Sequence, residues 1–175
     1  MPAGRRIYII GFMGSGKTTA GKKLAAALKW EFADLDILIE NRENLFIRDI
    51  FTRNGEEYFR QVESDLLKNP GLSEEMNFVI SVGGGTPCFF DNMDFMLSEG
   101  IVVYLRMTPG QLKERLDRER DMRPLLNNLQ GNDLLKFIKE RLADRESFYN
   151  RATISVDGFS FSTEEVIAKL NDLML

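Results

Sequence analysis

The sequence contains no histidine and a single cysteine, Cys88, among its 175 residues. Without an imidazole, Ser-His-Asp and Cys-His catalysis are excluded, as is any zinc site that needs a histidine ligand. One cysteine can form no internal disulfide, so the chain suits a reducing compartment. Acid–base chemistry must therefore come from carboxylates, lysines or bound water.

Long apolar runs, low-complexity linkers and an excess of positive charge are also missing. No apolar run approaches the roughly 20 residues that a membrane-spanning helix requires. The first residues lead directly into a predicted strand, which leaves no room for a signal peptide. The net charge of −4 argues against a general nucleic-acid binder. We therefore expect a cytoplasmic protein that acts as a monomer, without membrane or nucleic-acid partners.

The remaining composition is ordinary for one globular domain that spans residues 1–175. Hydrophobic residues make up 43% and charged residues 29% of the chain, values typical of soluble proteins. Strand-like and helix-like runs alternate, which indicates an α/β fold with a mostly parallel sheet. The predicted strands cover 6–10, 31–35, 78–82, 101–105 and 153–156. The predicted helices cover 17–28, 37–42, 46–52, 55–68, 91–98, 109–117, 133–149 and 162–174.

A phosphate-binding motif follows the first predicted strand. Residues 11–19 read GFMGSGKTT and fit the pattern G-x-x-x-x-G-K-[ST]. A strand, a glycine loop and a helix in that order surround an anion with backbone N–H groups and a positive helix end. The alternative, a glycine-rich turn that binds no ligand, does not explain why a strand precedes the motif and a helix follows it. The residues expected to contact ATP are Gly14, Ser15, Gly16, Lys17, Thr18 and Thr19.

Two of these side chains have separate expected roles at the triphosphate. The Lys17 ammonium would lie against the β- and γ-phosphates, and the Thr18 hydroxyl would ligate Mg²⁺. The pair Asp34 and Asp36 ends the second predicted strand, where ligands gather in an open α/β sheet. One carboxylate could act on Mg²⁺ and its waters and the other on a substrate hydroxyl. Alternatively, one of them only caps the next helix.

Other polar and glycine-rich positions allow both a structural and a functional interpretation. Arg60 and Glu63 are three residues apart on a predicted helix and could form an ordinary surface pair. The triplet 83–85, GGG, follows a strand and either brings backbone close to a ligand or forms a flexible turn before Pro87. Both interpretations of each motif remain open on these grounds.

The segment 115–131 interrupts the helical pattern and is rich in arginine. It is either a plain loop or a mobile lid that closes onto developing charge and expels water. Arg123 precedes Pro124 in this segment, and Arg145 lies on the following predicted helix. Arginine suits bidentate capture of carboxylate or phosphate better than lysine does.

Together, these motifs and their order resemble the shikimate kinase family of the P-loop, nucleoside-monophosphate-kinase-like group. The similar segments are GFMGSGKTTAGKKLA, FADLDILIE, IRDIFTRNGEEYFRQVE, SVGGGTP and RPLL, within about residues 7–157. The resemblance implies a five-stranded parallel sheet in the order 2-3-1-4-5, flanked by helices. It implies transfer of the ATP γ-phosphoryl group to the 3-hydroxyl of shikimate, in aromatic amino-acid biosynthesis, with Mg²⁺ as cofactor.

The family pattern also implies roles for individual residues in a substrate-binding region of about 34–63 and beyond. Asp36 would hold the shikimate ring hydroxyls and could serve as base, while Arg60 and Arg145 would clamp the carboxylate. Gly84 would contact shikimate. Gly83 and Gly85 would shape the surrounding wall. Glu63 would orient Arg60, and Asp34 would act on Mg²⁺ through water.

A catalytic role for Arg123 follows from the same resemblance, because the RPLL motif would carry it onto the transferred phosphate and the nucleotide when the lid closes. The chain departs from the family at Ser147, which replaces the proline of R-x-P-x-Y. The lid entry leaves open which arginine flanks the adenine: Arg115, Arg118 or Arg120. The competing hypotheses are another small-molecule kinase, such as a gluconate kinase, and a nucleotide-binding module without turnover.

Overall fold

The sheet at the centre of the molecule has five strands, all parallel, in the order β2-β3-β1-β4-β5. The structure is a computed structural model and describes residues 4–118 and 131–173. The strands are β1 (Arg6–Ile10), β2 (Glu31–Asp34), β3 (Phe78–Ser81), β4 (Ile101–Arg106) and β5 (Ile154–Asp157). This architecture confirms the predicted fold class and strand order.

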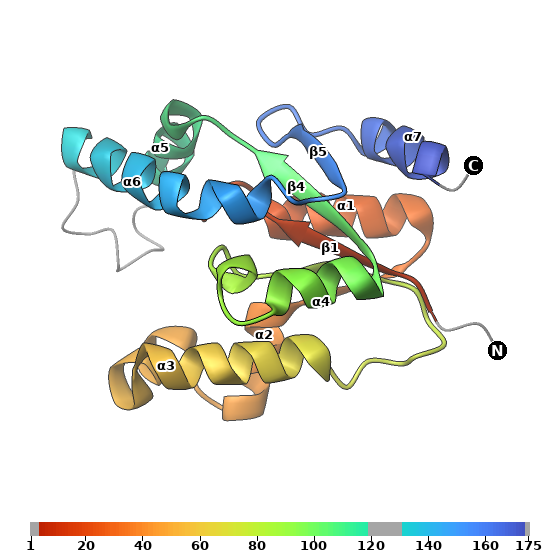
Figure 1. Cartoon of the computed structure of the whole chain (residues 1–175), viewed down its shortest axis with the longest axis horizontal. Coiled ribbons are helices and arrows are strands. Elements are labelled where there is room, and N and C mark those ends of the chain that lie inside the picture. Colours follow the sequence, from red (N-terminus) through yellow and green to blue (C-terminus); the bar gives the residue numbers. More distant parts are fainter. Residues whose placement is uncertain (1–3, 119–130, 174–175) are drawn as a thin grey trace.

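Helices cover both faces of the sheet (Figure 1). They are α1 (Lys17–Leu28), α2 (Leu35–Glu43), α3 (Ile47–Lys68), α4 (Asn92–Glu99), α5 (Pro109–Arg118), α6 (Gly131–Tyr149) and α7 (Thr163–Leu173), with the short 3₁₀ helix η1 (Thr86–Cys88). Buried side chains of α1 and α7 form one apolar cluster with one sheet face. Those of the other α-helices pack in a larger cluster on the opposite face. None of the helices in the described part of the chain has the length and apolar character needed to cross a membrane.

Strand β1 shows why the sheet has two buried faces. Ile7 and Ile9 pack in the α1/α7 cluster, whereas Tyr8 and Ile10 pack in the cluster on the other side. Successive strand residues point to opposite faces, so a strand between two helical layers is apolar at every position. The predicted strand at 6–10 is confirmed.

The kink in α3 lies where the sequence predicted the start of a second helix. Two helices, 46–52 and 55–68, were predicted there, and α3 is broken at Gly55, whose φ of 84° and ψ of 172° are not helical. Helix α6 begins at Gly131, two residues before the predicted range 133–149. The turn η1 was not predicted.

The topology brings three motif-bearing loops to one edge of the sheet. Strands β1 and β3 are direct neighbours, and β2 pairs with β3. All strands are parallel, so the loop 11–16, Asp34 and the triplet 83–85 follow the carboxyl ends of adjacent strands. Ligands bind at this edge in open α/β sheets.

Candidate active site

The phosphate-binding loop, residues 11–16, connects β1 to α1 and depends on glycine geometry. Gly14 and Gly16 have φ values of 77° and 85°, in the left-handed region that L side chains rarely adopt. Gly16 is also the residue that caps α1. A Cβ atom at Gly16 would lie 2.8 Å from a guanidinium nitrogen of Arg115, so α5 approaches the loop closely.

The Lys17 ammonium folds back over this loop. Its Nζ donates hydrogen bonds to the carbonyl oxygens of Gly11 (2.9 Å) and Phe12 (3.0 Å). The Ser15 hydroxyl beside it is buried and has no hydrogen-bond partner among the described residues. Lys17 thus brings a positive charge to the loop from which α1 starts, as a phosphate site requires.

Asp34 connects the phosphate-binding loop to α2. Its Oδ2 accepts a hydrogen bond from the Thr18 hydroxyl (2.8 Å), and its Oδ1 accepts from the Asp36 backbone N–H (3.1 Å). Asp34 therefore caps α2, as the structural alternative proposed, and also contacts the residue expected to ligate Mg²⁺. Within 4–118 and 131–173, no group of three or more Cys, Asp or Glu side chains could hold a metal by itself.

The carboxyl group of Asp36 is electrostatically unusual. Burial raises its pKa to about 6, and the negative charge of Asp34 adds to this effect, while the Lys17 ammonium opposes it. The carboxylates of Glu63 and Glu40 raise the pKa further, by smaller amounts. A carboxyl group with a pKa near neutrality can accept a proton and is suited to general-base chemistry.

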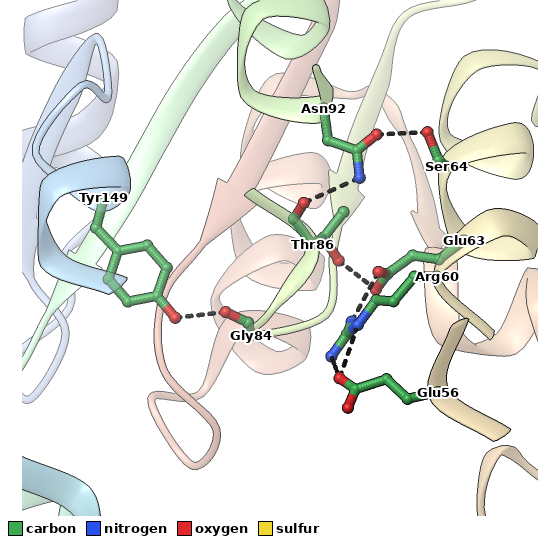
Figure 2. Close-up of polar contacts among 8 residues, drawn as sticks. All are labelled: Glu56, Arg60, Glu63, Ser64, Gly84, Thr86, Asn92 and Tyr149. Atoms are coloured by element: carbon green, nitrogen blue, oxygen red, sulfur yellow. Dashed lines mark hydrogen bonds and ion pairs between the residues drawn. The ribbon is translucent and has the colours of Figure 1, made fainter. Parts of the chain in front are cut away.

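Arg60 and Glu63 form a buried ion pair rather than the exposed pair that their spacing also allowed. The Arg60 Nη1 lies 2.8 Å from Glu63 Oε2, and their side chains are only 11% and 1% exposed. Arg60 also pairs with the exposed Glu56 (Figure 2). Its guanidinium lies 4.1 Å from the centre of the Phe89 ring. The surface-pair interpretation is therefore wrong.

The glycine triplet 83–85 lies against the charged side chains of the site. A Cβ atom at Gly83 would lie 2.9 Å from Glu63 Oε1 and 3.4 Å from Asp36 Oδ1, and one at Gly85 would lie 2.7 Å from Arg60 Nη2. None of the three residues has a positive φ. Glycine is required here because neighbouring atoms approach closely, not because the backbone is left-handed.

The carboxyl-terminal end of α6 supplies Arg145 and Tyr149. Arg145 lies 5.3 Å from the centre of the Phe12 ring, and its Nη1 would be 3.4 Å from a Cβ atom at Gly84. The Tyr149 hydroxyl donates to the Gly84 carbonyl (Figure 2), and burial raises the pKa of this phenol strongly. Ser147 is exposed on the same helix, which runs through it unbroken.

A cavity of about 470 Å³ lies beside the phosphate-binding loop and is lined by α1, α5 and the segment 158–161. The Arg115 side chain forms part of the cavity wall and donates hydrogen bonds to the carbonyl oxygens of Ser15 (3.0 Å) and Gly158 (2.9 Å). Arg118 also lines the cavity, but its exposed side chain pairs with Glu114. Arg120, Arg123 and most of the predicted lid lie outside the described residues.

Sequence reasoning did not identify several residues that shape this region. Phe89 and Phe12 stack against Arg60 and Arg145, and Thr86 contacts Glu63. The order of motifs carries no signal for these contacts, because each of them joins separate elements of the chain. Thr86 and Phe89 do lie directly beyond the glycine triplet, which is a signal that could have drawn attention to them.

The family described as "Shikimate kinase" matches residues 13–174 of the chain. A curated shikimate kinase of Parabacteroides distasonis is 39% identical over 171 residues, covering 98% of each chain. A solved shikimate kinase structure from Bacteroides thetaiotaomicron has a TM-score of 0.87 at 37% identity, covering 97% of this chain and 98% of that one.

Another similar structure is a shikimate kinase of Acinetobacter baumannii in complex with shikimate. It has a TM-score of 0.81 at 31% identity and covers 98% of this chain and 93% of that one. A gluconokinase of Sinorhizobium meliloti is more distant, with a TM-score of 0.61 at 20% identity over 97% of this chain and 93% of that one. The gluconokinase shares the fold alone.

Proposed function

This chain belongs to the shikimate kinase family, and we infer that it transfers the γ-phosphoryl group of ATP to the 3-hydroxyl of shikimate. The products are shikimate 3-phosphate and ADP, in a step of aromatic amino-acid biosynthesis. The hypotheses of a gluconate kinase and of a module without turnover are both weaker. The gluconokinase likeness concerns the fold, whereas the relatives at 31–39% identity are shikimate kinases.

One observation carries the assignment of the acceptor site: three charged side chains meet at the glycine triplet, next to the phosphate-binding loop. Positions 83, 84 and 85 would bring a Cβ atom within 3.4 Å of Asp36, Arg145 and Arg60 respectively. At Gly84 the Gly11 carbonyl is also only 3.3 Å away. A small anionic acceptor held there would lie beside the triphosphate.

We propose that Arg60 and Arg145 clamp the shikimate carboxylate and that Glu63 orients Arg60. A planar guanidinium forms two parallel hydrogen bonds to a carboxylate, which suits both positions. Asp36 accepts the proton of the attacking hydroxyl, an assignment supported by its raised pKa. Gly83, Gly84 and Gly85 form the wall against which the ring lies.

ATP is the second substrate. We propose that its phosphates bind Gly14, Ser15, Gly16, Lys17, Thr18 and Thr19, and that the cavity between α1, α5 and 158–161 accepts the adenosine. Of the described arginines that line it, Arg115 is the better candidate to flank the adenine, because two backbone carbonyls already fix it.

Magnesium fits the donor set at the start of α1. The Thr18 hydroxyl and the Asp34 carboxylate are oxygen ligands of the kind that Mg²⁺ prefers, Asp34 acting through water. When bound, Mg²⁺ supplies charge neutralisation between the β- and γ-phosphates. Too few carboxylates gather in the described residues to form a protein cage, which agrees with a cation held largely by phosphate and water.

Arg123 is proposed to stabilise the negative charge of the phosphoryl group during its transfer. By analogy with arginine fingers, R123A should lower kcat by about three to five decades and leave folding near wild type. Steady-state ADP release and thermal unfolding measure the two properties. The matched control is R5A, which removes an exposed arginine just before β1, at the opposite edge of the sheet from the phosphate-binding loop. A kcat within about threefold of wild type would contradict the role.

The decisive experiment compares ADP release from Mg-ATP with shikimate, with gluconate and without acceptor. Turnover with shikimate alone is expected. Turnover with gluconate would favour the other kinase, and ATP binding without any acceptor-dependent turnover would favour the non-catalytic module. We also propose that the chain is one domain, monomeric and cytoplasmic. Analytical ultracentrifugation tests the monomer, and fractionation of the source cells tests the location.

A further inference from the structure

A network of buried polar side chains lies behind the Arg60–Glu63 pair (Figure 2). The Thr86 hydroxyl donates to Glu63 Oε1 at 2.6 Å. The Asn92 side-chain amide donates to the Thr86 carbonyl at 3.0 Å, and the Ser64 hydroxyl donates to Asn92 Oδ1 at 2.7 Å. Glu63, Thr86 and Asn92 are 0% exposed and Ser64 is 3% exposed. This network therefore joins α3, η1 and α4 through hydrogen bonds that water does not reach.

Each oxygen of the Glu63 carboxylate has a different partner. Oε2 accepts from Arg60 and Oε1 accepts from Thr86. A buried carboxylate needs such donors, because an unpaired charge in the interior is costly. Since a carboxylate oxygen can only accept, the Thr86 hydroxyl must donate, and its direction is fixed. The two bonds together determine how the plane of the carboxylate is oriented.

Asn92 and Ser64, at the other end of this hydrogen-bond network, hold Thr86 in place. Asn92 binds the backbone carbonyl of Thr86, and Ser64 orients the Asn92 amide by donating to its oxygen. Ser64 is the neighbour of Glu63 on α3, so the hydrogen bonds leave that helix and return to it. Thr86 thus cannot move away from Glu63 without breaking a second buried bond.

Arg60 depends on this arrangement for its orientation. Its guanidinium is fixed on one side by Glu63 and on another by the Phe89 ring. The pair with Glu56 is weaker support, because the Glu56 side chain is 59% exposed and solvent screens such pairs. A bidentate bond to a carboxylate requires the fork to be held in one plane.

We propose that Thr86 is a positioning residue for shikimate binding, which acts through Glu63 on Arg60, with Asn92 and Ser64 keeping Thr86 in place. The inference rests on the proposed contact between Arg60 and the shikimate carboxylate. The acceptor's carboxylate does not react, so the network contributes to binding in the ground state and the transition state alike. Its loss should raise KM for shikimate rather than lower kcat.

The test is T86V, which removes the hydroxyl while keeping the shape of the side chain. KM for shikimate should rise about tenfold, the factor that corresponds to 1.4 kcal/mol, with kcat and KM for ATP within twofold of wild type. T86S, which restores a hydroxyl, should recover most of the affinity. The matched control T153V removes an exposed threonine hydroxyl just before β5, at the opposite edge of the sheet, and should leave KM for shikimate unchanged.

A double-mutant cycle separates positioning from general packing. If Thr86 acts through Arg60, T86V should have little further effect on shikimate affinity in an R60A background. Additive effects, or a T86V enzyme with an unchanged KM for shikimate, would overturn the proposal. If T86V does not fold, T86A takes its place under the same criteria.

Failure of the proposed function would look different. A wild-type enzyme without shikimate-dependent turnover would refute the activity itself. A wild-type activity with an R60A enzyme of normal KM would refute the carboxylate contact. A normal KM in T86V, or additive effects of T86V and R60A, refutes the positioning role alone when R60A itself is defective.

Discussion

The carboxyl group of Asp36 lies among charges of both signs, and burial together with Asp34 outweighs the effect of Lys17 on its pKa. The result, a pKa of about 6, places its titration where enzymes are commonly assayed. A protonated carboxyl group cannot take the proton of an attacking hydroxyl. The state of this one residue should therefore be visible in the pH dependence of both activity and stability.

We predict that kcat/KM for shikimate falls as the pH drops below about 6, because the base becomes protonated. D34N removes a neighbouring negative charge, lowers the pKa of Asp36 and should move this acidic limb to lower pH. A pH–rate profile of each enzyme measures the shift. Identical limbs in both enzymes would show that Asp36 is not the titrating group.

The same raised pKa makes the stability of the fold depend on pH. The direction of this dependence is opposite to that caused by a salt-bridged carboxylate, whose pKa is lowered by folding. The folded state holds this proton more tightly than the unfolded state, so the contribution of Asp36 to stability falls as the pH rises from about 4 to 6. D36N should therefore unfold at a higher temperature than wild type at pH 8, and the difference should shrink toward pH 4. This readout does not depend on activity.

Gly85 offers a third prediction at the scale of one residue. Its φ of −92° is open to alanine, but the new Cβ atom would lie 2.7 Å from Arg60 Nη2. G85A should raise KM for shikimate at least about tenfold, the factor that 1.4 kcal/mol gives, without changing KM for ATP. The control is G110A, since nothing lies within 4 Å of a Cβ atom there. Equal KM values would show that Arg60 moves aside without consequence.

At this scale the sequence could name the charged residues but not their surroundings. Arg60 and Glu63 have the same three-residue spacing whether they lie in water or in the interior, and here they are buried. The helix pattern contains no information about Phe89 or Thr86, which come from another part of the chain. Asp34 was assigned two competing roles, and the geometry allows both, because its two oxygens bind different partners.

Among the elements, α3 shows how one residue can set the direction of a binding helix. Gly55 adopts φ 84° and ψ 172°, a region essentially restricted to glycine, and space around it is open. The helix after this point carries Arg60 and Glu63. The position of the acceptor site therefore depends on a backbone conformation about a turn and a half away.

G55A should lower the free energy of unfolding by about 1–3 kcal/mol and also raise KM for shikimate, because the second half of α3 is redirected. Chemical denaturation and steady-state kinetics measure the two effects. G71A is the matched control: Gly71 also has a positive φ and open space, but lies in the segment before β3. It should lose stability alone. An unchanged KM in G55A would refute the link.

Most helix and strand ranges were predicted closely, since apolar periodicity and glycine or acidic boundaries mark them. The break in α3 was predicted at residues 53–54 and lies at Gly55, because glycine tolerates the positive φ found there. The order of the strands came from family resemblance, as periodicity identifies strands but does not arrange them.

At the scale of the whole molecule, the two apolar clusters share one sheet. Strand β1 contributes alternate side chains to each. A layer on one face cannot lose its packing without exposing the strands that support the other. We therefore expect the two faces to unfold together, as in a single domain.

The chain provides a separate optical probe for each face. Trp30, the one tryptophan, packs against the α1/α7 cluster, whereas Tyr8, Tyr104 and Tyr149 are buried in the other. Tryptophan fluorescence and tyrosine near-ultraviolet dichroism should give coincident denaturation curves with one midpoint. Two separate midpoints would mean that the faces form independent units.

The raised pKa of Asp36 gives substrate binding a calorimetric signature. The charge of a Mg-nucleotide bound beside Thr18 and Asp34 would shift this pKa and exchange a proton near pH 6, and the chain has no imidazole to exchange one in its place. The heat of binding Mg-nucleotide should then vary with the ionisation enthalpy of the buffer. The slope of that dependence counts the protons exchanged, and the difference in slope between wild type and D36N is the share that comes from Asp36.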